Sequence, residues 1–388
     1  MNRRQFIRQS GLVGASLVAA PLALLNGCAS RGGLHRSDAG ADAPLPISSC
    51  GLPPVRIRED REIRTVVGLR PYRPSGFVVR AERLGDTLVV HNYGHGGGGI
   101  TLSWGTGKLA VDLGAPGHAG PVAVLGCGAV GLANARLLQE AGFAVTIYAK
   151  ALPPETTSNI AGGQWFPFSV SERNRRSAAF DEQLIAAAEY AYRRYQIMVG
   201  PRFGVRWIRN YFLRDKEILE NGYLGTNSPL RGMMPEFRDL GPHEHPFGGH
   251  RYVRQVDTML IEPPVYLAAM LDEFLLASGK LVVRELNDRA AIQALPEKLV
   301  FNCTGLGAKS LFDDAELTPV KGQLTILLPQ PEVQYTVGTE DLYMFPRSDG
   351  ILLGGTFEHD QWSLEPDLEA KQRIVAGHKA LFDSFRRC

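Results

Sequence analysis

One β-α-β segment constrains the fold of this chain more strongly than any other feature. Residues 122–125 are an uninterrupted apolar run, residues 129–141 have helical apolar spacing, and a second strand is predicted over 144–148. The turn between the first strand and the helix reads Gly126-Cys127-Gly128-Ala129-Val130-Gly131. In this context the first glycine makes the turn, the second admits a pyrophosphate, and the third lets the helix pack closely. The segment therefore predicts a dinucleotide-binding unit.

The end of the second strand departs from the usual dinucleotide pattern. An acidic residue normally binds the ribose hydroxyls at that position. Here the sequence is Ala149-Lys150. Lys150 could bind the additional phosphate of NADP, or Glu155 and backbone groups could bind the ribose instead. The choice of dinucleotide stays open at this point.

Composition excludes a nucleic-acid-binding function. Lys and Arg total 42 against 40 Asp and Glu, a net charge of +2, and no long basic run occurs. The nine histidines and five cysteines show no zinc-ligand spacing. Strand patterns alternate with helical ones from residue 66 to 355, which predicts a mixed α/β fold.

The N-terminal segment has the features of an export signal. Arg3-Arg4 precede an uncharged apolar stretch, Gly11–Leu25, which is shorter than the ~20 residues of a membrane span. We expect residues 1–30 to be a twin-arginine signal peptide that directs the protein to the periplasm or cell envelope. Cys28 stands where a lipoprotein would be acylated, although Asn26 is atypical, so a lipid anchor is an alternative. Residues 31–50 are predicted to be a flexible linker.

A second glycine-rich segment is the most unusual part of the sequence. It reads His91-Asn92-Tyr93-Gly94-His95-Gly96-Gly97-Gly98-Gly99-Ile100-Thr101-Leu102-Ser103-Trp104-Gly105. A glycine run between a strand and a helical stretch exposes backbone N–H and C=O groups to a ligand. For His91 and His95 we expect a structural role that holds the loop in shape.

Four motifs together resemble the FAD-dependent D-amino-acid oxidase family. His91 to Gly105 resembles the family's flavin-contacting glycine loop, and residues 156–167 resemble its segment beside the flavin ring. Asn302-Cys303-Thr304-Gly305 is similar to its third FAD strand, and Gly68-Leu69-Arg70-Pro71 to its substrate-arginine turn. The resemblance covers nearly all of residues 51–388.

The resemblance implies a two-part fold in an altered order. The family has the arginine turn and glycine loop near its C-terminus, whereas here both precede the nucleotide-binding strand, which predicts a circular permutation. Cys50 and Cys388 would flank the same cut and could form a disulfide. We expect a Rossmann-like FAD-binding domain and a mixed-sheet substrate domain. The first comprises residues 75–164 and 263–312, and the second comprises residues 51–74, 165–262 and 313–388.

The resemblance also assigns site residues. Arg70 would bind the substrate carboxylate, the Gly97 carbonyl would accept a hydrogen bond from the substrate amine, and Arg254 and Tyr252 would line the substrate pocket. Arg254 is found by counting back from Glu262, where the family has a tyrosine. The residues expected to contact FAD are Gly96, Gly97, Gly98, Gly99, Ile100, Thr101, Gly126, Cys127, Gly128, Ala129, Val130, Gly131, Thr157, Ser158, Gly162, Gly163, Gln164, Leu286, Thr304 and Gly305.

The implied activity is oxidation of a D-amino acid by hydride transfer to FAD, with O2 as acceptor and H2O2, a keto acid and ammonia as products. Three alternatives remain at this point. The first is an oxidase or dehydrogenase of glycine, sarcosine or another secondary amine, which passes electrons to a quinone rather than to O2. The second is an NADP-linked dehydrogenase, and the third is an exported protein without turnover. The sequence does not define the oligomeric state.

Overall fold

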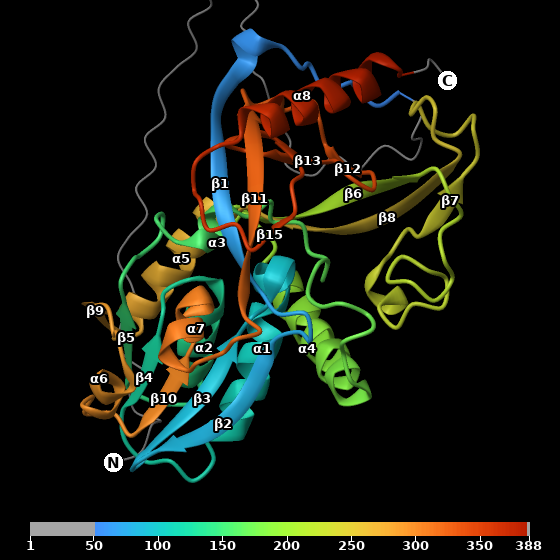
Figure 1. Ribbon diagram of the computed structural model, residues 1–388. Coiled ribbons are helices and arrows are strands. Elements are labelled where there is room, and N and C mark those ends of the chain that lie inside the picture. Colours follow the sequence, from blue (N-terminus) through green and yellow to red (C-terminus); the bar gives the residue numbers. More distant parts are fainter. Residues whose placement is uncertain (1–50, 386–388) are drawn as a thin grey trace, which may run out of the picture. The chain divides into compact units, whose positions relative to one another are not determined.

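Two β-sheets organise the structure, a computed structural model that describes residues 51–385 (Figure 1). One sheet has six strands and the other nine. The predicted signal peptide, the linker, Cys28, Cys50 and Cys388 lie outside the described residues. Among residues 51–385, no helix combines the length and apolar character needed to cross a membrane.

The six-stranded sheet contains the predicted dinucleotide-binding unit. Its order is β2-β3-β10-β4-β5-β9, with β2 antiparallel to β3 and all other neighbours parallel. Its strands are β2 (Val78–Leu84), β3 (Thr87–Tyr93), β4 (Val122–Leu125), β5 (Val145–Ala149), β9 (Lys280–Val283) and β10 (Leu299–Asn302). Parallel strands must be covered on both faces, so the strand residues are apolar without alternation.

Helices cover both faces of this sheet. Val122 and Val124 pack into one hydrophobic cluster, whereas Ala123 and Leu125 pack into another on the opposite face. The first cluster lies under α1 (Gly99–Gly114), α2 (Ala129–Glu140), α4 (Ala178–Gln196) and α5 (Pro263–Leu276). The second lies under α6 (Arg289–Gln293) and α7 (Ala308–Leu311). The β4-α2-β5 unit confirms the prediction made from the glycine motif.

The nine-stranded sheet is largely antiparallel. Its order is β1-β11-β14-β13-β12-β6-β8-β7, with β15 paired to β11. Its strands are β1 (Glu62–Tyr72), β6 (Val205–Arg214), β7 (Arg238–Leu240), β8 (Tyr252–Ile261), β11 (Thr318–Leu327), β12 (Tyr335–Gly338), β13 (Tyr343–Arg347), β14 (Gly350–Gly354) and β15 (Glu358–His359). The helix α8 (Leu368–Asp383) packs Ile374 and Leu381 onto one face. The predicted mixed α/β class with two sheets is therefore confirmed.

Local sequence signals define several helix boundaries. The Ser177 side chain accepts a hydrogen bond from the Phe180 N–H at the start of α4, and Asp367 does the same for two amides of α8. Pro263 and Pro264 open α5, because proline needs no N–H bond in the first helical turn. The short helices are α3 (Thr157–Ile160) and the 3-10 turns Glu59–Arg61, Gly96–Gly98, Arg231–Met233 and Gly305–Gly307.

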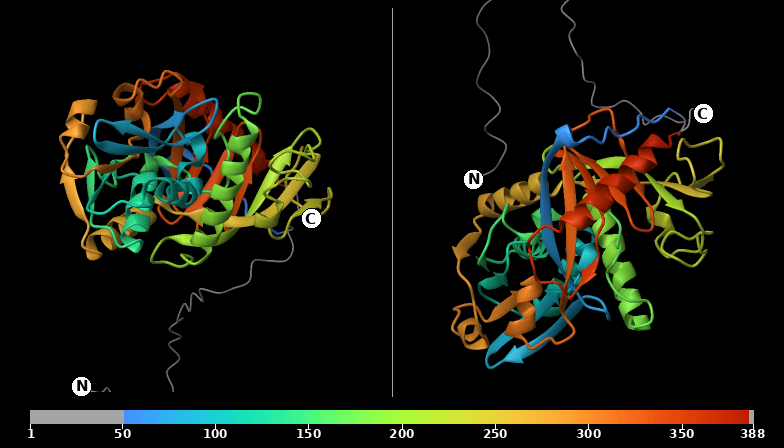
Figure 2. Two further views of the ribbon diagram at one scale, coloured as in Figure 1. Left: turned by 90° about the horizontal axis from the view of Figure 1, so that it is seen from below. Right: turned by 45° about the horizontal axis from the view of Figure 1, so that its top comes forward.

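The strand β1 runs from the nine-stranded sheet to the loops of the other sheet. It pairs along its whole length with β11, and Tyr72 at its end bridges to His95 beside the glycine run. The right-hand view of Figure 2 shows β1 and β11 side by side. This course brings the predicted substrate arginine next to the predicted cofactor loops.

Candidate functional site

The glycine turn after β4 has the geometry expected of a phosphate-binding turn. Gly126 has a φ of +102°, and a Cβ there would lie 2.5 Å from the carbonyl oxygen of Cys303. A Cβ on Gly131 would lie 2.1 Å from the carbonyl oxygen of Gly126, so helix and turn touch through backbone. At the start of α2, the Ala129 N–H donates to the Ser158 hydroxyl at 3.1 Å. The turn therefore leaves space that only glycines permit, as a pyrophosphate requires.

The segment after β3 forms a second glycine cradle. Gly96–Gly98 make one 3-10 turn and α1 begins at Gly99. The Gly97 N–H donates to the Ser169 carbonyl at 3.0 Å, and a Cβ on Gly97 would lie 2.8 Å from the Phe168 carbonyl oxygen. The glycines thus let two backbone segments pack against each other at the start of a helix.

Buried histidines support this glycine loop. His95 bonds through Nε2 to the Thr106 hydroxyl at 2.9 Å and stacks on Phe77 at 5.3 Å. Burial lowers the pKa of His95 to about 3, so the ring is neutral. His91 bonds through Nδ1 to Asn302, which in turn accepts from the Thr304 hydroxyl at 2.7 Å. These contacts agree with the structural role expected of both histidines.

The segment 156–167 connects the two sheets. Thr101 donates through its hydroxyl to the Phe166 carbonyl at 3.1 Å, which ties the glycine loop to this segment. Gly163 has a φ of +91°, and a Cβ there would lie 1.9 Å from the Ile261 carbonyl oxygen of β8. Gln164 bridges to Leu260 of the same strand. The segment is therefore held in place from both sides.

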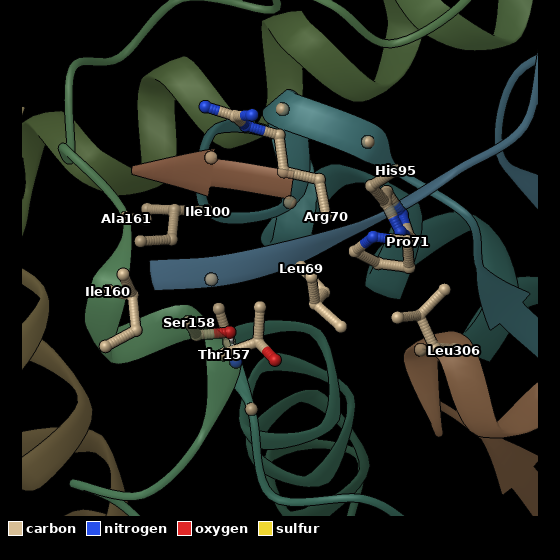
Figure 3. A pocket seen from close by; sticks show the side chains of 18 of the residues that line it. Leu69, Arg70, Pro71, His95, Ile100, Thr157, Ser158, Ile160, Ala161 and Leu306 are labelled. Carbon is tan, nitrogen blue, oxygen red and sulfur yellow. Dashed lines mark hydrogen bonds between the residues drawn. The ribbon is translucent and has the colours of Figure 1, made fainter. Parts of the chain in front are cut away.

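One cavity of about 1250 Å³ joins these features. It is large enough for an extended dinucleotide together with a small substrate. Figure 3 shows Leu69 and Arg70 leaving β1 in opposite directions inside it, with Thr157 and Ser158 at the start of α3. The predicted residues that line it are Arg70, Gly96, Gly97, Gly99, Ile100, Thr101, Gly126, Cys127, Gly128, Ala129, Val130, Thr157, Ser158, Gly162, Gly163, Gln164, Leu286, Thr304 and Gly305.

Four predicted residues do not line the cavity. Gly98 and Gly131 are packing positions, since a Cβ on Gly98 would lie 2.6 Å from Val170. Arg254 is buried, and its guanidinium is held by Asp239 through two bonds of 2.7 Å. Tyr252, at the first position of β8, lies outside the lining as well.

The structure places Arg254 away from the cavity for a physical reason. Asp239 faces it across the β7-β8 pair, and the ring of Phe237 lies 4.6 Å from its guanidinium carbon. A buried guanidinium keeps its charge, so it takes the nearest carboxylate. The expected substrate contacts of Arg254 and Tyr252 therefore have no geometric support.

Arg70 has the opposite environment. Its guanidinium donates to the Thr356 carbonyl and to the Tyr343 hydroxyl, each at 3.2 Å, and lies 5.6 Å from the ring of Phe357. Among residues 51–385, no carboxylate forms an ion pair with it. A half-buried guanidinium that lacks a counter-ion and faces a cavity is suited to bind a carboxylate ligand.

Sequence reasoning missed Tyr343 and Gly322. Nothing in the local sequence of Tyr343 distinguishes it from a core aromatic. Gly322 lies on β11 opposite Gly68, and a Cβ on it would approach Arg70 to 2.5 Å. Only strand pairing brings these residues to Arg70.

The ribose end of the cavity has charged groups of both signs. Lys150 and Glu285 form an exposed ion pair at 3.1 Å, and both line the cavity with Glu155 and Arg284. Lys150 is therefore already partnered by a carboxylate, which weakens the argument for an additional phosphate. The cysteines Cys127 and Cys303 are buried free thiols, and burial raises the pKa of Cys127 to about 12. No His, Cys, Asp and Glu cluster within residues 51–385 is arranged to hold a metal ion.

The fold and the cavity define a dinucleotide-dependent oxidoreductase, and an arginine without a carboxylate partner among the described residues lines its cavity. Comparison with known proteins supports this class. The family model "FAD dependent oxidoreductase" matches residues 51–113 and 121–388. The chain belongs to this family, so FAD is its cofactor and it is an oxidoreductase of the D-amino-acid oxidase type.

Individual relatives agree with the family match. The chain is 31% identical over 272 residues to a D-amino-acid oxidase of Rubrobacter xylanophilus, covering 66% of this chain and 76% of that protein. It is 31% identical over 269 residues to a D-amino-acid oxidase of Streptomyces coelicolor, covering 68% and 78%. Glycine oxidase from Geobacillus kaustophilus has a similar fold, with a TM-score of 0.51, 18% identity and coverage of 68% and 79%.

The residues present fit FAD. Glycines 126 and 128 line the cavity where the N-terminus of α2 begins, and their missing side chains leave the space a pyrophosphate needs. The glycine run 96–99 offers main-chain groups at the start of α1. The Thr304 N–H and hydroxyl both donate to the side-chain oxygen of Asn302, and these bonds hold the backbone in place just after β10.

Proposed function

We propose that this protein oxidises D-amino acids, with O2 as electron acceptor. A D-amino acid, O2 and water would yield a keto acid, ammonia and hydrogen peroxide. The observation that carries the proposal is the guanidinium of Arg70, which has no carboxylate partner among the described residues and shares a cavity with the FAD-binding glycines. When bound, FAD supplies the acceptor for the two electrons and the hydrogen removed from the substrate Cα.

The residues of the chain would act by binding and orientation. Arg70 would bind the substrate carboxylate through its planar fork, and the Tyr343 hydroxyl beside it could donate a hydrogen bond to the same group. The Gly97 carbonyl would accept from the substrate amine. No side-chain base is required if the amine is neutral, because the Cα hydrogen leaves as a hydride and not as a proton. Two fixed contacts orient the Cα–H bond for this transfer.

Anaerobic reduction of the bound flavin tests this proposal. We expect the visible absorption of the purified holoenzyme to bleach with D-amino acids and not with their L-enantiomers, and to return with formation of peroxide when O2 is added. Bleaching by glycine or sarcosine alone would contradict the proposal and favour an amine oxidase. Bleaching by D-amino acids without reoxidation by O2 would indicate a quinone as acceptor.

We also propose a circular permutation, in which the family's C-terminal part has moved to the front of the chain and the new cut lies before the arginine turn. The family match in two blocks, 51–113 and 121–388, supports it. Val55 and Ile57 pack in one hydrophobic cluster with Leu381 and Phe382 of α8, so the two ends of the described chain are neighbours (Figure 1). Adjacent ends are what a cut within one exposed loop of the unpermuted fold would produce. On this basis we propose the division into FAD-binding and substrate-binding parts given above.

Export and a closing disulfide complete the proposal. Cys50 and Cys388 would pair in an oxidising compartment. A thiol count on the exported, denatured protein should find Cys127 and Cys303 reduced and both terminal cysteines oxidised. Replacing Arg3 and Arg4 by lysine should retain the precursor in the cytoplasm, and mass spectrometry of the mature N-terminus should show whether Cys28 is acylated.

A further inference from the structure

We infer that Arg214 recognises the side-chain carboxylate of an acidic substrate, so that D-aspartate or D-glutamate is preferred over neutral D-amino acids. The inference rests on the proposed function, because it concerns the side-chain half of the same substrate site. Arg214 is the last residue of β6 and lines the same cavity as Arg70.

The strand register places the two arginines on one face of the nine-stranded sheet. Gly338 of β12 pairs with Tyr343 of β13 on one side and with Phe212 of β6 on the other. Because side chains alternate along a strand, Arg214 points to the same face as Phe212. Tyr343 accepts a hydrogen bond from Arg70 on that face. Arg70 and Arg214 therefore approach the same region from opposite sides of Gly338.

The missing side chain at Gly338 leaves room between the arginines. A Cβ there would make only ordinary contact with Phe212, at 3.5 Å, so glycine is not forced by packing. Two strand spacings separate β13 from β6, about 10 Å. Two long arginine side chains can reach a small dicarboxylate across that distance.

The guanidinium of Arg214 is only partly bonded. Its Nη1 donates to the Leu213 carbonyl at 2.7 Å and to the Gly338 carbonyl at 3.2 Å. Among the described residues, nothing accepts from Nε or Nη2, and no carboxylate forms an ion pair with Arg214. Arginine has five N–H donors, so three remain for a ligand. The Gly338 bond fixes the side chain, which is a preorganised arrangement for an anion.

Burial leaves the positive charge of Arg214 poorly compensated by the groups around it. Desolvation lowers the pKa of Arg214, and attraction to Glu340 acts in the opposite direction. Glu340 and Asp341 line the rim of the cavity but are exposed to solvent. Water screens them, so they leave the charge of Arg214 poorly compensated. A substrate carboxylate would provide the missing counter-ion.

The choice of Arg214 corrects the earlier expectation for Arg254. Both lie on the paired strands β6 and β8, and Arg254 is the register partner of Phe212. Asp239 neutralises Arg254, whereas Arg214 has no such partner within residues 51–385. Recognition of a second carboxylate therefore falls to Arg214.

Matched substrate pairs test the inference on the wild-type holoenzyme. D-aspartate and D-asparagine, or D-glutamate and D-glutamine, differ only in the charge of the side-chain end. We expect the acidic member to have a kcat/KM about 10- to 100-fold higher, the range of one charged hydrogen-bonded contact. Equal or reversed values would overturn the inference without any variant.

Variants of Arg214 test whether this residue causes the preference for acidic substrates. Arg214→Leu should reduce the ratio of kcat/KM for D-aspartate over D-asparagine to about one, and Arg214→Lys should give an intermediate ratio because a point charge replaces the fork. Arg64→Leu, which removes an exposed charge from β1, and Arg373→Leu, which removes one from the rim of the cavity, should keep the wild-type ratio. An equal loss of this ratio in either control would overturn the inference, because the summed positive charge of the protein, and not a contact with Arg214, would then explain the preference.

The outcomes separate this inference from the proposed function. If D-alanine and D-asparagine bleach the flavin and acidic substrates have no advantage, the oxidase function stands and the role of Arg214 is refuted. If no D-amino acid bleaches the flavin while a secondary amine does, the proposed function is refuted and the inference with it.

Discussion

Gly322 lies directly against the guanidinium of Arg70: a Cβ on Gly322 would come within 2.5 Å of both Nη atoms. The contact joins neighbouring strands, since Gly322 and Arg70 belong to the paired β11 and β1. The arginine therefore has its position because the backbone beside it has no side chain.

Gly322→Ala should displace the arginine and leave the fold intact. The atoms in the way are the end of a flexible side chain, so the guanidinium moves and the strands need not. We expect FAD to be retained and kcat/KM to fall by about 100-fold, the cost of misplacing a substrate-orienting group by about 1 Å. Gly232→Ala is the control, because a Cβ there meets nothing within 4 Å. If Gly322→Ala were as active as the wild type, the position of the Arg70 guanidinium would not matter for activity.

Arg70→Ala should remove the carboxylate contact altogether. A lost charged hydrogen bond costs about 1.5–3 kcal/mol, so two lost bonds should lower kcat/KM by more than about 100-fold. The absorption spectrum of the bound flavin should be retained. Arg70→Lys should recover only part of the activity, because an ammonium group cannot bind bidentately. Loss of flavin in both variants would assign Arg70 to cofactor binding instead.

Tyr343→Phe should weaken substrate binding moderately. The variant keeps the ring that stacks on Phe345 and removes the hydroxyl that accepts from Arg70 at 3.2 Å. A hydrogen bond to a charged group is worth about 1.5–3 kcal/mol, so we expect kcat/KM to fall by about 10- to 100-fold, mostly through KM. Steady-state kinetics on one D-amino acid at saturating O2 measures the effect. A decrease confined to kcat would indicate that the hydroxyl acts on the reaction and not on binding.

Gly131→Ala should abolish FAD binding through packing. The new Cβ would lie 2.1 Å from the Gly126 carbonyl oxygen, which is backbone and cannot move without opening the turn. We expect a colourless protein with a lower melting temperature. The ratio of visible to ultraviolet absorbance and a thermal melt measure the two effects, again with Gly232→Ala as control. A yellow Gly131→Ala protein would argue against this turn as the pyrophosphate site.

His95 should make the protein acid-sensitive. Burial lowers its folded-state pKa to about 3 from an unfolded value of about 6.5, so the unfolded chain binds a proton first as the pH falls. The contribution is fully present above pH ~6.5 and declines by about 1.4 kcal/mol per pH unit below it. Urea unfolding from pH 7 to 5 should show this slope, and His95→Gln should show a shallower one. Equal slopes would contradict the neutral, buried state of His95.

The dinucleotide turn was predictable because its constraints are local. Gly126 needs a positive φ, and Gly131 packs against the carbonyl of Gly126, five residues before it. Both constraints therefore lie within a few consecutive residues of the sequence. The start of α5 at Pro263 was predictable for the same reason. The start of α4 likewise depends on a local signal, because the Ser177 side chain caps its first turn.

The substrate half of the site was not predictable in the same way. Arg70 and Tyr343 are separated by 273 positions, and they meet because β1, β11, β14 and β13 are neighbours in one sheet. Counting along the chain from Glu262 leads to Arg254 on β8, whose charge is taken by Asp239, whereas Arg214 lies on the neighbouring strand β6. Spacing alone carries no information about such a partner.

The sequence by itself determined the nucleotide-binding unit, the glycine loop and the identity of Arg70, because glycine geometry and short motifs are encoded by neighbouring residues. The tertiary structure alone decided which charged groups face the cavity. Arg214 lacks a carboxylate partner among the described residues and Arg254 has one, and this difference depends on which strand lies beside each of them. Strand order is a long-range property, so the chemistry of the substrate pocket became visible only in the folded chain.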